Sequence, residues 1–114
     1  MNEIKRGDIW LVSLDPTIGH EINKTRPCVI IQNDTGNKNS PLTIIAPITS
    51  QHLDEIYPIE VALPRQITRL DKDSKAMLDQ IRTIDKRRLI KKICALNKEI
   101  MQKINEALKT SLGL

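Results

Sequence analysis

The chain has 114 residues, of which 39% are hydrophobic, and a formal net charge of +4 at pH 7. This length suits one domain, residues 1–114, that buries roughly two-thirds of its unfolded surface. Trp10 and Tyr57 are the only aromatic residues, which argues against RNA-binding modules that stack bases on rows of exposed aromatic side chains. No apolar run reaches the ~18 residues of a membrane span, and residues 1–5 do not resemble a signal peptide.

The spacing of cysteine and histidine predicts no metal site. Cys28 and Cys94 lie far apart, each in an apolar run. We therefore expect buried free thiols in a reducing cytoplasm rather than a disulfide. His20 and His52 are also widely separated, and this set of four residues fits no zinc pattern. The sequence thus predicts a cytoplasmic protein without a metal or other cofactor.

The first half of the chain predicts three strands. Residues 9–14 form an apolar run that ends in a turn. Residues 28–32 are mostly apolar, which is typical of a strand buried on both faces, and Pro27 suits its first position. Residues 42–48 predict the third strand, in which Pro47 favours an edge or a bulge near the end.

The connections in this half differ in character. Residues 15–25 form a loop that is long for a hairpin, and long loops in compact domains are usually functional or mobile. Residues 36–41 are rich in turn formers and predict an irregular connection. Residues 50–57 predict a polar loop.

The second half predicts shorter strands. Residues 59–63 alternate between apolar and polar side chains, as a half-buried strand does. Residues 64–73 form a connection with room for one helical turn, and residues 74–84 are compatible with either a helix or a strand. Residues 86–89 suggest one helical turn, and residues 93–96 predict a short last strand.

The clearest element is a C-terminal amphipathic helix. Asn97 suits its N-cap, and Gly113 suits its end. A single apolar stripe recurs with helical spacing and consists of Ile100, Met101, Ile104, Ala107, Leu108 and Ser111 or Leu112. Short strands followed by one helix predict a mainly β, α+β fold in which the helix packs on a small barrel-like sheet.

Arg26 is the first candidate for a functional residue. It stands at the mouth of the strand 28–32, next to a rigid proline. A forked and permanently charged guanidinium on such a mount suits a phosphate group. Thr49, at the end of the third strand, offers a hydroxyl that can donate to the same phosphate. The alternative is that Arg26 is a surface ion-pair partner and Thr49 a turn residue.

Six short motifs follow one another along the chain. They are Arg6-Gly7-Asp8-Ile9-Trp10, Asp15-Pro16 with Gly19-x-Glu21, Arg26-Pro27, Gln32-Asn33-Asp34, Pro47-Ile48-Thr49 and Asp79-Gln80-Ile81-Arg82-Thr83-Ile84-Asp85. In this order they resemble the MazF/PemK family of bacterial toxin ribonucleases. No single motif is specific, but the ordered set is, and it reaches from residue 6 to the C-terminal helix.

This resemblance implies an SH3-like barrel in which residues 74–84 form a strand. It implies a homodimer and a cognate antitoxin with an acidic C-terminal tail, the two proteins forming a type II toxin–antitoxin system. It also implies that Arg26 and Thr49 are the catalytic pair of a sequence-specific endoribonuclease. Such an enzyme needs no metal, cleaves single-stranded RNA, and leaves 2′,3′-cyclic phosphate and 5′-hydroxyl ends.

Two rival functions are weighed against this one. A CcdB-like gyrase poison shares the fold. Proteins of that family end in Trp-Gly-Ile, whereas this chain ends in Ser111-Leu112-Gly113-Leu114. A non-catalytic RNA-binding barrel would normally carry an aromatic platform, which this sequence lacks.

Candidate RNA-binding residues in the predicted loops are His20, Glu21 and Gln51. His20 and His52 suggest the acid–base pair of classical ribonucleases. The alternative is that both are solvated loop residues, since the family requires histidine at neither position. Glu21 matches the family's loop glutamate. Three roles are open for it: it positions Arg26, it contacts RNA, or it is only a solvated loop residue.

Two further candidates, Gln80 and Arg82, alternate with an isoleucine and so share one face of the predicted strand. The resemblance implies that this segment lies by the dimer interface and the substrate groove. Residues 86–92 form the densest basic run of the chain. It predicts either an RNA groove that binds by counterion release or a solvated charged face.

Overall fold

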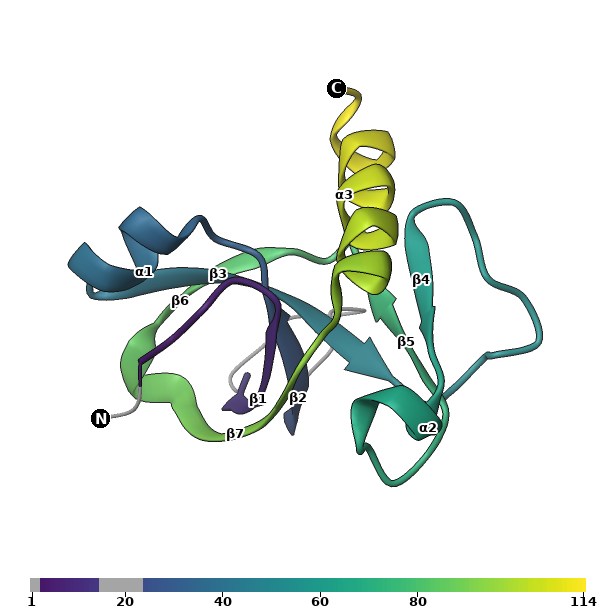
Figure 1. Ribbon diagram of the computed structural model, residues 1–114, viewed down its shortest axis with the longest axis horizontal. Coiled ribbons are helices and arrows are strands. Elements are labelled where there is room, and N and C mark those ends of the chain that lie inside the picture. Colours follow the sequence, from purple (N-terminus) through teal and green to yellow (C-terminus); the bar gives the residue numbers. More distant parts are fainter. Residues whose placement is uncertain (1–2, 15–23) are drawn as a thin grey trace.

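The computed structural model describes residues 3–14 and 24–114, whose elements are arranged as Figure 1 shows. His20 and Glu21 lie outside the described residues, as does most of the long loop predicted at residues 15–25. In chain order the elements are β1 (Asp8–Ser13), β2 (Thr25–Ile30), α1 (Asp34–Asn39), β3 (Leu42–Thr49), β4 (Glu60–Leu63), α2 (Arg65–Thr68), β5 (Ser74–Met77), β6 (Arg82–Asp85), a 3₁₀ turn (Lys86–Arg88), β7 (Leu89–Ala95) and α3 (Lys98–Leu112).

The described strands form one antiparallel sheet in the order β4-β5-β3-β2-β1-β7, with β6 also paired to β3. The start of β3, residues 42–45, pairs with β6, whereas its end, Ile48 and Thr49, pairs with β5. Among the described residues no pairing joins β4 to β7, so the sheet is not closed. The predicted mainly β fold with a C-terminal helix is confirmed, with an open rather than a closed sheet.

Both faces of the central strands are buried. Ile9 and Val29 belong to one hydrophobic cluster, which includes Ile104 of α3. Their chain neighbours Trp10 and Cys28 point the other way, into a second cluster on the opposite face. Burial on both faces explains why these strands are continuously apolar rather than alternating. The prediction that the β2 strand is buried on both faces is thus confirmed.

The C-terminal helix α3 begins and ends where its cap residues predict. The Asn97 side chain accepts a hydrogen bond of 2.9 Å from the backbone N–H of Ile100, which satisfies one of the unpaired donors of the first turn. Gly113 ends the helix with φ +73°, a left-handed conformation that glycine adopts without strain. The stripe is buried at Ile100, Ile104 and Ala107, and α3 lies against β4 (Figure 1).

Two predictions for the first half are wrong in detail. The segment predicted as an irregular connection contains α1, because the Asn33 side chain caps it by accepting from the N–H of Gly36 at 2.8 Å. Pro47, predicted to mark an edge or a bulge, lies in the central strand β3, where it pairs in register with Cys28 of β2. It follows the segment of β3 paired with β6 and precedes the segment paired with β5. Among the described residues, β3 has no ladder partner at Pro47 on the side opposite β2, so a residue without an N–H is tolerated there.

The prediction of one strand over residues 74–84 is also wrong, because this segment contains two strands, β5 and β6. A turn at Leu78–Gln80 separates β5 from β6, and the N–H of Gln80 donates to the carbonyl of Met77 at 3.2 Å. Leu78 is fully buried and donates its N–H to the carbonyl of Ile59 at 3.0 Å. The turn consists of buried Leu78 followed by exposed Asp79 and half-buried Gln80. It contains no glycine or proline, the residues that most strongly mark a turn in a sequence.

Candidate active site

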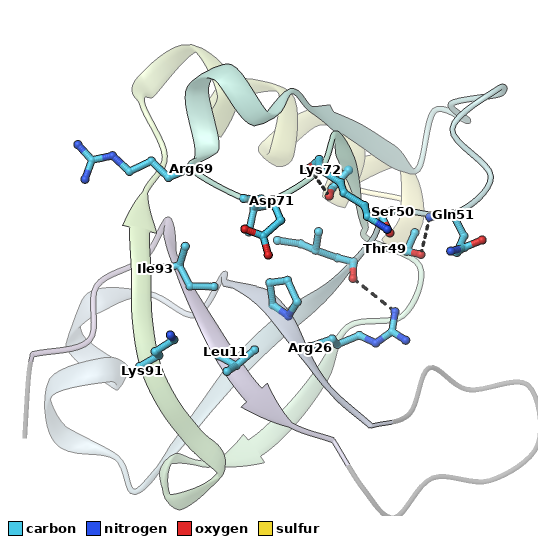
Figure 2. Close-up of a pocket in the computed structure, with 14 residues that line it drawn as sticks. Leu11, Arg26, Thr49, Ser50, Gln51, Arg69, Asp71, Lys72, Lys91 and Ile93 are labelled. Carbon is cyan, nitrogen blue, oxygen red and sulfur yellow. Dashed lines mark hydrogen bonds between the residues drawn. The ribbon is translucent and has the colours of Figure 1, made fainter.

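A cavity of about 600 Å³ opens where the start of β2 and the end of β3 meet β7 and the loop that follows α2 (Figure 2). One side is apolar and consists of Leu11, Pro27, Ile48, Leu70 and Ile93. In the part of the lining that the structure describes, the charged side chains are four cations and one carboxylate, Asp71. The cations are Arg26, Arg69, Lys72 and Lys91. Among the described lining residues positive charge is therefore in excess, which favours an anionic ligand.

Arg26 enters this cavity from the second residue of β2. Its backbone position is fixed by pairing with Val12 of β1, and Pro27 follows in the same strand. The guanidinium Nη1 donates to the carbonyl of Ile48 at 3.5 Å, so the half-buried side chain crosses from β2 to the end of β3 (Figure 2). β2 begins at Thr25, so Pro27 is its third residue and not its first, as was predicted.

Thr49 lies at the last position of β3, next to the residue whose carbonyl binds Arg26. It is 7% exposed, and its Oγ1 accepts a hydrogen bond of 3.1 Å from the backbone N–H of Gln51 (Figure 2). A hydroxyl oxygen that accepts keeps its own O–H as a donor. The structure therefore brings Arg26 and Thr49, the predicted pair, to one cavity.

The remaining candidates of the described chain are distributed unevenly. Gln51 lines the cavity beside Thr49, whereas His52 is exposed with φ +54° and is not among the lining residues. Arg82 donates to the carbonyl of Leu14 at 3.2 Å and supports the end of β1. Gln80 lies in the turn before β6, where its amide donates to the sulfur of Met77 at 3.7 Å.

The basic run is mostly engaged in local contacts. Lys86 donates to the carbonyl of Asn37, Arg87 forms an exposed ion pair with Asp85 at 3.0 Å, and Arg88 donates to the carbonyl of Ser13 at 3.1 Å. Lys92 pairs at 3.3 Å with Asp8, which is buried. β7 includes the end of this run because Leu89, Lys91 and Lys92 pair with β1. Only Lys91 of the run lines the cavity.

The wall formed by Arg69, Asp71 and Lys72 was not predicted from the sequence. Arg69 ends α2 in a left-handed conformation with φ +60°, and this turn carries the three residues over the end of β3. In the sequence they look like an ordinary polar connection. The one available signal is an arginine, an aspartate and a lysine placed closely together, which is too common to identify a site.

Both cysteines are free thiols, as expected, but only Cys28 is buried and Cys94 is half-buried. Burial raises the pKa of Cys28 to about 12, although the charges of Arg26 and Arg82 oppose this. Burial also raises the pKa of Cys94. Both side chains therefore stay protonated at neutral pH and are poor nucleophiles.

In residues 3–14 and 24–114, no three side chains of the His, Cys, Asp or Glu type gather in a way that would hold a metal ion. No described helix has the length and apolar character needed to cross a membrane.

Residues 5–112 match the family model of PemK-like, MazF-like toxins of type II toxin–antitoxin systems. Among solved structures, the chain is similar to MazF from Deinococcus radiodurans, with 23% identity, full coverage of both chains and a TM-score of 0.85. It is also similar to an endoribonuclease from a mycobacterial species, with 24% identity over 100% of this chain and 95% of that one, and a TM-score of 0.81. A mycobacterial endoribonuclease in complex with its cognate antitoxin has 23% identity over 97% and 96% of the two chains, and a TM-score of 0.81.

Proposed function

Because the chain belongs to the family of PemK-like, MazF-like toxins of type II toxin–antitoxin systems, we propose that it is an endoribonuclease that acts as the toxin of such a system. In this proposal residues 1–114 form one catalytic domain that works in the cytoplasm as a homodimer. It cleaves single-stranded RNA at specific sequences and needs no metal. The observation that carries the proposal is the meeting of Arg26 and Thr49 at one cavity with an excess of positive charge.

The chemistry follows from what RNA itself provides. The 2′-oxygen beside the scissile phosphate bonds to phosphorus, and its proton passes to a general base. The bond from phosphorus to the 5′-oxygen breaks, and that oxygen takes up a proton. The products are a 2′,3′-cyclic phosphate and a 5′-hydroxyl. Because the substrate supplies the nucleophile, no metal-bound water is required.

Arg26 and Thr49 have separate roles in this step. The Arg26 guanidinium binds the non-bridging phosphate oxygens as negative charge develops there, and the Thr49 hydroxyl donates to the same phosphate. Gln51, on the rim next to Thr49, is a proposed RNA contact. His20, Glu21, Gln80 and Arg82 remain candidates for RNA contacts beyond the cavity, and the apolar wall offers a surface for the flat face of a base.

The direct test is to incubate the pure protein with a long RNA in the presence of EDTA and to map the new 5′ ends. We expect cleavage at a recurring short sequence, because the RNA supplies its own nucleophile. The fragments should carry 5′-hydroxyls, which a kinase labels without prior phosphatase treatment. Random cleavage, 5′-phosphate ends or loss of activity with EDTA would each contradict the proposal.

A free ribonuclease must be restrained, and we propose that an antitoxin with an acidic C-terminal tail covers the cavity. The mycobacterial relative in complex with its cognate antitoxin supports the expectation of such a partner. The cationic side chains that would bind RNA phosphates also attract carboxylates. A disordered tail that folds as it binds covers a large surface while remaining easy to degrade.

This mechanism predicts that tail and RNA exclude each other. Titrating labelled, uncleavable RNA on the toxin with added tail peptide should displace the RNA. Association of the tail should slow as salt rises, because exposed charges are screened within about 10 Å at 0.1 M salt. Simultaneous binding of both at saturation, without loss of RNA affinity, would rule out a shared surface.

A further inference from the structure

Lys75 of β5 is a buried cation in a small protein. Its side chain is 5% exposed, and it pairs with Glu60 of β4, which is 9% exposed, at a distance of 3.0 Å between Nζ and Oε2. Lysine is almost never fully buried unless it is paired, because leaving water costs the charged group its hydration. A buried pair of this kind is weak evidence for stability as such, so its other contacts are informative.

Two of those contacts are to one loop, residues 50–59, which joins β3 to β4, and a third is to Glu60, the first residue of β4. The ammonium has three donors, and it reaches the carbonyl of His52 at 2.8 Å, the carbonyl of Glu55 at 3.3 Å and Oε1 of Glu60 at 3.1 Å. The same Oε1 accepts from the backbone N–H of Tyr57 at 3.0 Å. The pair therefore holds the loop near its start, in its middle and near its end.

This loop begins at the candidate active site. Thr49 is the residue of β3 that pairs with Lys75 across the ladder. Ser50 and Gln51 follow it and line the cavity, and the N–H of Gln51 donates to Thr49 Oγ1. His52 then turns the chain with φ +54°, a conformation that non-glycine residues hold only when their surroundings fix it. The bond from Lys75 to the His52 carbonyl is one such constraint.

We propose that Lys75 is a positioning residue that fixes Ser50 and Gln51 at the edge of the cavity and thereby sets which RNA sequence is cleaved. Lys75 does not touch the substrate and acts through the loop backbone. Its charge is neutralised by Glu60, so the donors serve the loop and add little to the potential in the cavity. The inference rests on the proposed ribonuclease function, because only RNA cleavage reports on the loop's role in selection.

Four proteins test it: wild type, Lys75→Met, the double variant Lys75→Met/Glu60→Gln, and Lys109→Met as a matched control. Lys75→Met removes the three donors and leaves Glu60 buried without its partner. The double variant removes both charges, so it relieves that penalty while the bonds to the His52 and Glu55 carbonyls stay lost. Lys109→Met makes the same substitution in a Lys–Glu pair, with Glu106, that is 63% and 74% exposed.

Thermal unfolding, amide exchange of residues 51–57 and kcat/KM on the preferred RNA and on single-base variants are then measured. Both Lys75 variants should exchange these amides faster. Their selectivity, the ratio of kcat/KM between preferred and altered RNA, should fall by roughly tenfold or more, the scale of losing one hydrogen-bonded base contact. The double variant should recover part of the lost thermal stability but none of the selectivity, and Lys109→Met should match wild type.

The outcomes separate the two hypotheses. If the wild type cleaves no RNA, the proposed function is wrong and this inference falls with it. If the wild type cleaves but the double variant recovers selectivity together with stability, Lys75 serves only to stabilise the fold and the inference is wrong. Unchanged selectivity or unchanged exchange in Lys75→Met would also overturn it. If Lys75→Met does not fold, the double variant decides alone.

Discussion

Replacing Arg26 with alanine is expected to lower the rate of RNA cleavage by about 10²–10³-fold, the usual effect of removing a preorganised donor to a developing charge. Arg26→Lys should also fail, because an ammonium cannot reproduce the planar, two-pronged contact of a guanidinium with phosphate oxygens. Thr49→Ala should reduce cleavage severely through loss of the hydroxyl donor. Single-turnover cleavage of a short RNA under excess enzyme measures all three.

The fold should survive these changes, because polar side chains at strand ends rarely hold a core together. Arg87→Ala is the matched control for arginine, since the Arg87 side chain is exposed and paired with Asp85 away from the cavity lining. Thr83→Ala serves for threonine, as an exposed strand residue. Cleavage by Arg26→Ala at the wild-type rate would place the active site elsewhere, and His20 and His52 would become the leading candidates.

A single 2′-deoxy sugar on the 5′ side of the scissile phosphate is expected to block cleavage completely while leaving RNA binding nearly unchanged. The substitution removes the proposed nucleophile, and the phosphate that Arg26 binds is untouched. Binding of the modified RNA is measured by fluorescence anisotropy, and its cleavage by gel analysis over times that exhaust the unmodified substrate.

The matched control carries the same 2′-deoxy sugar on the 3′ side of the scissile phosphate, where no nucleophile is lost. That substrate should be cleaved at close to the normal rate. Cleavage of the first substrate, or a requirement for magnesium, would mean that water attacks the phosphorus and that Arg26 and Thr49 act in a different reaction.

The cavity also bears on how the basic charge of the chain is used. Of the dense run at residues 86–92, four side chains are held by partners within the protein, and Lys91 alone lines the cavity. Arg69 and Lys72 come from a different part of the chain. Local charge density in a sequence is thus a poor guide to the surface that meets an anionic ligand, because neighbouring charges along a strand or turn point to different sides.

The sequence by itself determined those features that depend on nearby residues. Helix α3 could be placed by its stripe and by the caps Asn97 and Gly113, because capping and helical periodicity are local. The burial of β2 on both faces followed from its unbroken apolar run. The ordered motifs predict Arg26 and Thr49 as a catalytic pair. They do so through the resemblance to a family and contain no information on the distance between the two side chains.

Only the tertiary structure decided what depends on residues far apart in the chain. The start of β3 pairs with β6 and its end pairs with β5. This pairing explains why Pro47 is tolerated between the two paired segments and why residues 74–84 form two strands, and strand pairing of this kind is non-local. The wall of Arg69, Asp71 and Lys72 lines the cavity because the chain turns at Arg69, in a left-handed conformation, where α2 ends. Lys75, one charge in an apolar run, became buried because folding brings Glu60 and the carbonyls of His52 and Glu55 to it. A lysine enters a protein interior where such partners replace its water.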